Sequence, residues 1–292
     1  MKNRISTLFH IFLVMTSLSA SEALSKEILN SKTVSPQKPI RKKTAALAPT
    51  KPQKPEVQWD EWYTIEANGG IPYGYYNDRF EKLPDGRLHY ENRTWKLEEG
   101  WINEESLGAY AQKDEFFTPL FFSFWSNYRS SETQVDGTFT DGKQLSVRVR
   151  QAEKERPAIK RSIPDKTSLS VLFPVFLGSR IKGAKLGETK TFRIIFEDDI
   201  NDTFAPKSGS YRLEAPDEFA KKSKTTKFQI TSRDQLSDWY VDERGLPIKI
   251  IMRASKIIVD RVQSRAVAEA FIRKAPPTDL PAEDAPNDEA ER

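Results

Sequence analysis

The feature of this sequence that most constrains its fold is a long series of strand-like runs separated by turn residues. Glycine-containing turns punctuate residues 57–274, among them Asn68-Gly69-Gly70, Pro84-Asp85-Gly86 and Asp141-Gly142. Between turns, apolar and polar residues alternate, as in Leu145, Val147 and Val149. A period of two is expected of a strand with one buried face. The pattern therefore predicts neighbouring antiparallel strands joined by tight turns.

Runs of this kind recur along the whole region. We expect strands over residues 62–65, 71–80, 87–97, 101–112, 133–140, 143–150, 190–197, 210–214, 225–231, 238–242, 246–253 and 256–262. The predicted fold class is mainly β with minor α: a single curved antiparallel sheet, or half-barrel, with two short helices.

Two segments predict those helices. Asp165 can cap a helix that runs to Phe173, where Pro174 would break or kink it. Ser264 can cap a second helix, with Val267, Ala270 and Phe271 on one face.

Composition divides the chain into four parts. Residues 1–23 combine Lys2 and Arg4 with an apolar stretch and small residues, the pattern of a signal peptide. Residues 24–56 are rich in proline and lysine and predict a disordered linker, which could be a plain tether or could touch anionic surfaces. Residues 57–274 form the β-rich domain, and residues 275–292 an acidic disordered tail. After signal cleavage we expect no transmembrane span.

The sequence contains no cysteine and two histidines, His10 and His89. Disulfides, thiolate catalysis, cysteine-ligated metals and a lipid-modified cysteine are therefore excluded. Phosphate-binding glycine loops and a nucleophilic serine elbow are also absent. His89 lies among strand residues, where a structural role is expected. We predict no catalytic residue, no metal site and no cofactor.

The order of elements resembles exported bacterial proteins of unknown function whose open, curved antiparallel sheet is like the half-barrel of periplasmic lipoprotein carriers. The residues that carry the resemblance are Trp62-Tyr63, Ile71-Pro72-Tyr73-Gly74, Phe117-Thr118-Pro119-Leu120, Gly183 with Leu186-Gly187-Glu188, and Trp239 to Lys249. The resemblance implies a curved sheet that shelters lipid, glycolipid or a hydrophobic peptide. It assigns no catalytic residue.

Residues 116–125 form the most unusual local segment, because six of the ten are Phe or Trp. They could be core beneath the sheet, line a cavity, or contact a membrane or partner. With the apolar residues near Pro174, they could close the concave face, the helix acting as a lid. The predicted ligand-binding residues are Phe117, Phe121, Trp125, Leu172 and Phe176.

Three charged groups suggest alternatives. The acidic run from Glu197 to Asp202 reads as a solvated turn, with calcium binding as the alternative. Carboxylates beside aromatic residues would suit a polysaccharide-active enzyme; they are Asp60, Glu61, Asp242 and Glu243. A basic face could grip anionic head groups or polysaccharide, or be simply solvated; it comprises Arg148, Arg150, Lys154, Arg156, Lys160 and Arg161.

Together these patterns predict an exported, periplasmic or secreted bacterial protein that is a monomer. We expect it to bind or carry an apolar or amphipathic ligand in the concave face of its sheet, without enzymatic activity. The alternatives are a structural module of the envelope that pairs a sheet edge with a protein partner, and the polysaccharide-active enzyme. The β-rich region is nearly neutral, because residues 57–274 carry only about +2 of the formal net charge of +4, so no nucleic-acid partner is expected.

Overall fold

The computed structural model describes residues 54–273, with the exception of residues 68, 99, 130 and 202. The predicted signal peptide, most of the predicted linker and the predicted acidic tail lie outside these residues. The first strand begins at Glu56, the last residue assigned to the linker.

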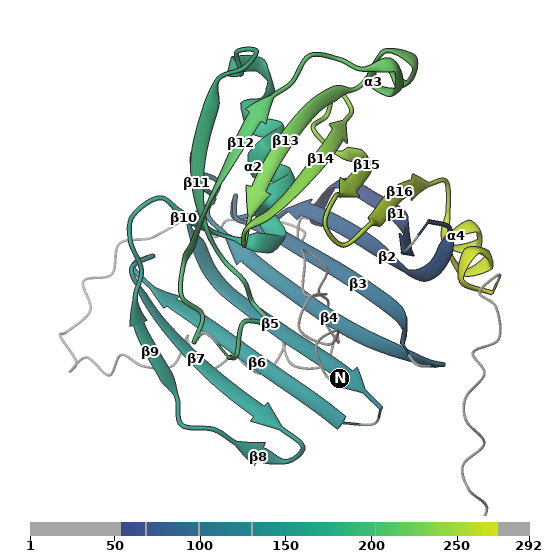
Figure 1. Cartoon of the computed structure of the whole chain (residues 1–292). Helices are drawn as coiled ribbons and strands as arrows, with labels where there is room; N and C mark the ends of the chain where they lie inside the picture. Colours follow the sequence, from purple (N-terminus) through teal and green to yellow (C-terminus); the bar gives the residue numbers. More distant parts are fainter. Residues whose placement is uncertain (1–53, 68, 99, 130, 202, 274–292) are drawn as a thin grey trace, which may run out of the picture.

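A single sheet dominates the fold, as the sequence pattern predicted (Figure 1). Its first part contains β1 (Glu56–Ala67), β2 (Ile71–Lys82), β3 (Leu88–Glu98), β4 (Trp101–Ala111), β5 (Pro119–Tyr128), β6 (Ser131–Thr140), β7 (Gln144–Gln151), β8 (Lys154–Glu155) and β9 (Ile159–Ser162). Its second part contains β10 (Thr167–Leu169), β11 (Thr189–Ile195), β12 (Lys207–Leu213), β13 (Thr226–Ser232), β14 (Gln235–Val241), β15 (Pro247–Met252) and β16 (Ile257–Val262).

The strands follow each other in space almost as they do in sequence. The order runs from β10 through β16, then β1 through β8, and β9 pairs with β7. The pairs are antiparallel except for β10 with β11, which are parallel at Thr167–Leu169 and Arg193–Ile195. The antiparallel pairing of β1 with β16 joins the two halves. The result is one open sheet that curls around its own inner face (Figure 1).

The helices differ from the prediction in part. No helix begins after Asp165; β10 is followed by the short 3₁₀ turn η1 (Ser170–Leu172), and α2 (Phe173–Arg180) begins where the sequence predicted a break. Pro174 lies in the first turn of α2, where its missing N–H has no intrahelical acceptor to lose. Proline here starts a helix instead of ending one.

The other two helices lie outside the curl. Ser264 caps α4 (Arg265–Ile272), as predicted, and accepts a hydrogen bond from the Val267 N–H. The buried face of α4 was predicted wrongly: it holds Ala268 and Ile272, while Val267 is exposed. This face packs over Tyr75. The short α3 (Glu218–Ser223), which the sequence pattern did not predict, is capped by Asp217.

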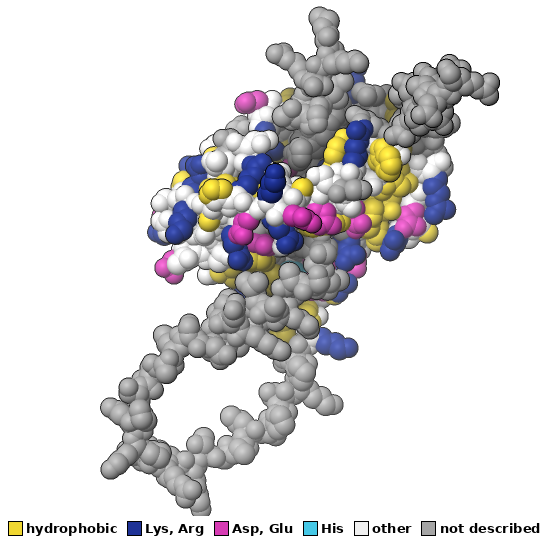
Figure 2. Space-filling view, turned by 90° about the horizontal axis from the view of Figure 1, so that it is seen from below, with side chains coloured by type: hydrophobic (Ala, Val, Ile, Leu, Met, Phe, Trp, Pro, Cys, Tyr) yellow, Lys and Arg dark blue, Asp and Glu magenta, His cyan; other side chains and the backbone are white. Residues whose placement is uncertain are grey.

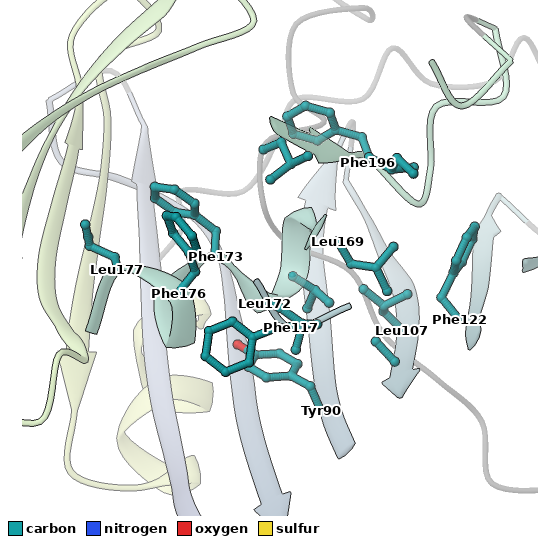
Figure 3. Close-up of a cluster of buried hydrophobic side chains, with 14 of the residues drawn as sticks. Tyr90, Leu107, Phe117, Phe122, Leu169, Leu172, Phe173, Phe176, Leu177 and Phe196 are labelled. Carbon is teal, nitrogen blue, oxygen red and sulfur yellow. The ribbon is translucent and has the colours of Figure 1, made fainter. Parts of the chain in front are cut away.

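The main core lies between the inner face of the sheet and the segment η1–α2. Figure 1 shows α2 between strands β11–β15 and strands β2–β5. Leu172, Phe173 and Leu177 have no measurable exposure, and Figure 3 shows this segment among side chains from β3, β4 and β5. A single sheet cannot bury both its faces alone. The enclosed segment therefore supplies the second layer of the core.

A close backbone contact fixes the position of α2. Gly178 of α2 packs directly on Gly245 in the turn between β14 and β15, and a Cβ at Gly245 would stand 2.2 Å from the Gly178 Cα. Gly245 also has a φ of +88°, a conformation in which glycine is favoured. Both the turn and the helix position depend on this pair.

Two buried carboxyl groups belong to the core. Glu197 accepts hydrogen bonds from the Ser170 hydroxyl (2.5 Å) and the Val171 N–H (3.2 Å), and so holds the start of η1. Burial raises its pKa to about 7. Asp78 of β2 accepts from Asn92 and Tyr90, and burial raises its pKa to about 7 as well.

The contact between Gly178 and Gly245 can be tested with a matched pair of substitutions. Gly86→Ala, at the same φ of +88° but with no atom within 4 Å of the new Cβ, should lower the free energy of unfolding by about 1–2 kcal/mol. Gly245→Ala should lower it by about 2–5 kcal/mol, because overpacking against α2 adds to the strain. Urea denaturation of both variants measures the difference, and equal losses would refute the contact.

Glu197 predicts a pH dependence of stability. Its folded pKa lies above its unfolded value, so the folded state binds the proton more tightly and stability falls as pH rises from about 4.5 to about 7. Glu197→Gln removes this loss, which is on the order of 3 kcal/mol. The urea midpoint of the variant relative to the wild type should therefore rise between pH 5 and pH 7.5. Glu243→Gln, at an exposed position, is the control; a difference that does not change with pH would contradict the assignment.

Candidate functional site

A cavity of about 320 Å³ lies beside α2, at the edge of the sheet formed by β10 and β11. Five of its eleven lining residues are apolar: Phe116, Phe173, Phe176, Phe192 and Ile194. Its polar lining consists of Asp165, Lys166, Ser168, Thr191, Arg193 and Ser208. A volume of this size is at the lower end of the range for small-molecule sites.

Four aromatic rings define the apolar part of the cavity. Phe173 and Phe176 lie on the same side of α2, with ring centroids 6.0 Å apart, and Figure 3 shows the two rings side by side. The ring centroid of Phe192, in β11, lies 4.5 Å from that of Phe173. Phe173 has no measurable exposure, so the small exposed parts of Phe176 and Phe192 supply the aromatic surface that α2 and β11 present to the cavity.

Phe116 reaches the cavity because of the loop between β4 and β5. The Asp114 carboxylate accepts hydrogen bonds from the N–H groups of Phe116 and Thr118, each at 3.0 Å. Phe117 has a φ of +52°, which phenylalanine rarely adopts. The loop reverses the chain between Ala111 and Pro119, and within it Phe117 enters the core while Phe116 borders the cavity.

The edge of the sheet explains why the cavity is there. β10 pairs with β11 only at Arg193–Ile195. The preceding residues of β11 pair with β12 on one side and, in the part of the chain that the structure describes, with no strand on the other. α2 and residues 165–168 surround the remaining space.

Positive charge gathers at the cavity. Lys166 Nζ lies 5.4 Å from the centroid of Phe116, and the Arg180 guanidinium lies 5.5 Å from the same ring and 5.0 Å from that of Phe176. Arg193 lines the cavity and donates a long hydrogen bond of 3.4 Å to the Asp165 carbonyl. Cations over aromatic faces are favourable, so these aromatic rings hold this charge in place.

The structure separates the predicted ligand-binding residues. Phe176 lines the cavity. Phe117 and Leu172 belong to the main core instead, near Tyr90 in Figure 3. Phe121 and Trp125 alternate along β5 with the buried Phe122 and Phe124 and are only half-buried. They lie on the opposite face of the sheet, where Phe121 contacts Tyr110.

Other residues of this site were not predicted. Phe192 and Ile194 fall on the apolar phase of a predicted strand, a pattern that also describes core residues. Lys166 and Arg193 come from two separate segments that only the parallel pairing of β10 with β11 brings together. The predicted role of α2 as a lid also changes, because most of the helix is enclosed in the core.

Three of the four carboxylates proposed for polysaccharide chemistry lie within ion-pair distance of arginines: Asp60, Glu61 and Asp242. Arg244 Nη2 lies 2.8 Å from Glu61 and 3.1 Å from Asp242, and Arg261 lies 2.9 Å from Asp242. Hydrogen bonds from Arg261 and from the Leu246 N–H lower the pKa of Asp242 despite its partial burial. A general acid needs a raised pKa, so this arrangement does not favour that chemistry.

The acidic run is not a solvated turn throughout. Glu197 is fully buried, and Arg233 lies 3.8 Å from Asp198 and 3.2 Å from Asp199. Within residues 54–273, apart from the four undescribed positions, no three acidic, His or Cys side chains form a group that could hold a metal ion.

His89 and the basic face have ordinary structural surroundings. His89 of β3 stacks on Tyr110 at 4.4 Å and lies 3.4 Å from Glu81. Arg148 and Arg150 point outward from β7, and Arg150 donates to Gln134 (2.6 Å). Figure 2 shows basic side chains interspersed with acidic and hydrophobic ones on the face it presents. None of the helices that the structure describes is long and apolar enough to cross a bilayer.

Comparisons with known proteins give limited information. No family model matches the sequence, and no curated protein matches it. A crystal structure of a β-barrel-like protein of the domain of unknown function DUF1849 from Brucella abortus superposes with a TM-score of 0.48 and 13% identity, over 72% of this chain and 96% of that chain. A DUF1089 family protein from Pseudomonas aeruginosa gives a TM-score of 0.32 and 12% identity, over 71% and 95%.

Both neighbours are bacterial proteins of families without an assigned function, as the resemblance in the sequence led us to expect. Neither is described as a lipoprotein carrier, so that part of the resemblance stays a prediction. At these TM-scores and identities the similarity assigns neither a family nor a function to this chain.

Proposed function

We propose that this protein is an exported, non-enzymatic protein of the bacterial envelope that binds an apolar or amphipathic small molecule in the cavity beside α2. The observation that carries this proposal is the cavity of about 320 Å³, whose lining includes four phenylalanines. Export is proposed from the signal-peptide pattern of residues 1–23.

The composition of the wall favours binding over catalysis. Ligand sites are mostly apolar with a few placed polar groups, and this cavity combines five apolar side chains with polar groups. The two carboxyl groups whose pKa is raised to about 7, Asp78 and Glu197, are not among its lining residues. The cavity therefore holds an apolar surface without a poised acid or base.

A second candidate function uses the same edge of the sheet. Because the first residues of β11 have no paired strand on one side within the described residues, an extended segment of a partner protein could add to the sheet there. This function corresponds to the alternative predicted from the sequence, a structural module that pairs a sheet edge with a protein partner.

Uptake of a neutral apolar fluorophore tests the binding function. N-phenyl-1-naphthylamine should bind the full-length mature protein with one molecule per chain and a rise in fluorescence. Ser208→Trp places a large ring at the lining of the cavity, at an exposed strand position, and should lower the affinity at least about tenfold. Fluorescence titration measures both constants.

Ser146→Trp is the matched control, because Ser146 is an exposed strand residue of β7 and does not line the cavity. It should bind like the wild type, and thermal melting should show that both variants are folded. Absence of binding by the wild type would overturn the proposed function. Equal affinity of Ser208→Trp and the wild type would place the probe elsewhere and overturn the assignment to this cavity.

A further inference from the structure

We propose that the cavity selects amphiphiles with an anionic head group and that Lys166 and Arg193 contact that group. This inference rests on the proposed function and names the chemical class of its ligand. It follows from the charges at the cavity, from the partners of those charges and from the apolar side chains beside them.

The charges around the cavity are unequally paired. Arg180 is held by Glu115, with 3.2 Å between Nη1 and the carboxylate and a further hydrogen bond to the Glu115 carbonyl (2.7 Å). Asp165 lies 3.0 Å from Lys143. The two acidic side chains near the cavity are thus each matched by a cation other than Lys166 and Arg193.

Lys166 and Arg193 are different from Arg180. Among the described residues, neither has a carboxylate within ion-pair distance, and both line the cavity. Lys166 lies in a turn with a φ of +61°, held by a hydrogen bond of 2.7 Å from the Thr167 hydroxyl to the Pro164 carbonyl. The turn presents a lysine over the Phe116 ring. The net positive charge of this pair favours an anion.

The apolar part of the lining requires an apolar body beside the charge. Phe116, Phe176 and Phe192 offer no hydrogen bonds, so a bare inorganic anion would make no favourable contact with this apolar part of the lining. The small volume favours a single chain or a small ring system. The ligand class is therefore a compact molecule with one apolar part and one carboxylate, sulfonate or phosphate group.

Two fluorophores that differ by one group test the inference. 8-Anilino-1-naphthalenesulfonate carries a sulfonate on the same aromatic skeleton as neutral N-phenyl-1-naphthylamine. The wild type should bind the sulfonate at least about tenfold more tightly, since a hydrogen bond to a charged group contributes this much. Added salt should lower the affinity for the sulfonate only.

Substitutions of Lys166 and Arg193 test whether these two cations cause the preference for the sulfonate. Lys166→Gln and Arg193→Gln should each lower the ratio of the two affinities about tenfold, and Lys166→Glu should lower it further. Lys160→Gln, on β9, removes an exposed cation that does not line the cavity and should leave the ratio unchanged. Among the described residues the Lys166 side chain donates no hydrogen bond to the backbone, so Lys166→Gln tests the charge while the turn is kept by Thr167.

Failure of the anionic selectivity and failure of the proposed function give different results. If both fluorophores bind equally, or if the ratio does not respond to Lys166→Gln and Arg193→Gln, the anionic selectivity is overturned while the proposed function stands. If neither fluorophore binds, the proposed function itself fails. Loss of selectivity in Lys160→Gln as well would show a general surface effect and overturn the assignment.

Displacement of the sulfonate identifies the source of the head group. Dodecanoate and dodecyl phosphate, below their micellar concentrations, should displace it, whereas dodecanol and dodecyltrimethylammonium should not. Displacement by phosphatidylglycerol as well would point to a membrane lipid, and displacement by the single-chain compounds alone to a free amphiphile. Displacement by the cationic compound would contradict the inference.

Discussion

The fold depends on the burial of one apolar segment, residues 169–177, inside a sheet that is open at its edges. Leu169, Leu172, Phe173 and Leu177 have no measurable exposure, although the sheet around them ends at β8 and β10. A closed barrel can fill its interior from its own strands. Here a 3₁₀ turn and a helix do so, and Gly178 on Gly245 sets how closely that helix approaches the sheet.

The sequence predicted most of this architecture, because alternation and turn residues are local signals. The prediction failed where one local sequence pattern is compatible with two different structures. Pro174 can end a helix or begin one, and the distinction depends on η1, which Glu197 holds from 26 residues away. In β5, aromatic residues occupy both faces, so the alternation that would separate Phe121 from Phe122 is lost. A shift of one residue moves a side chain to the opposite face.

The site was less predictable than the fold, because its residues come from segments that only the finished topology brings together. Phe176 was identified from an apolar run, but Phe116 depends on a reversal at Phe117 with positive φ. Lys166 and Arg193 meet through the parallel pair of β10 and β11, the one exception in an antiparallel sheet. No local sequence pattern distinguishes a lysine or arginine of the site from the other lysines and arginines of a highly charged chain.

The partners of the polar groups separate those that hold the fold from those available to a ligand. Glu197, Asp78 and the buried Lys96, whose Nζ lies 2.6 Å from both oxygens of Glu105, all have partners, as buried polar groups must. Removing either partner would leave a buried charge or donor unsatisfied. Lys166 and Arg193 have no carboxylate partner in the described chain, and the fold does not need one to keep them at the cavity. Charges without a carboxylate partner beside apolar side chains are those on which an anionic ligand can act without first breaking an ion pair of the fold.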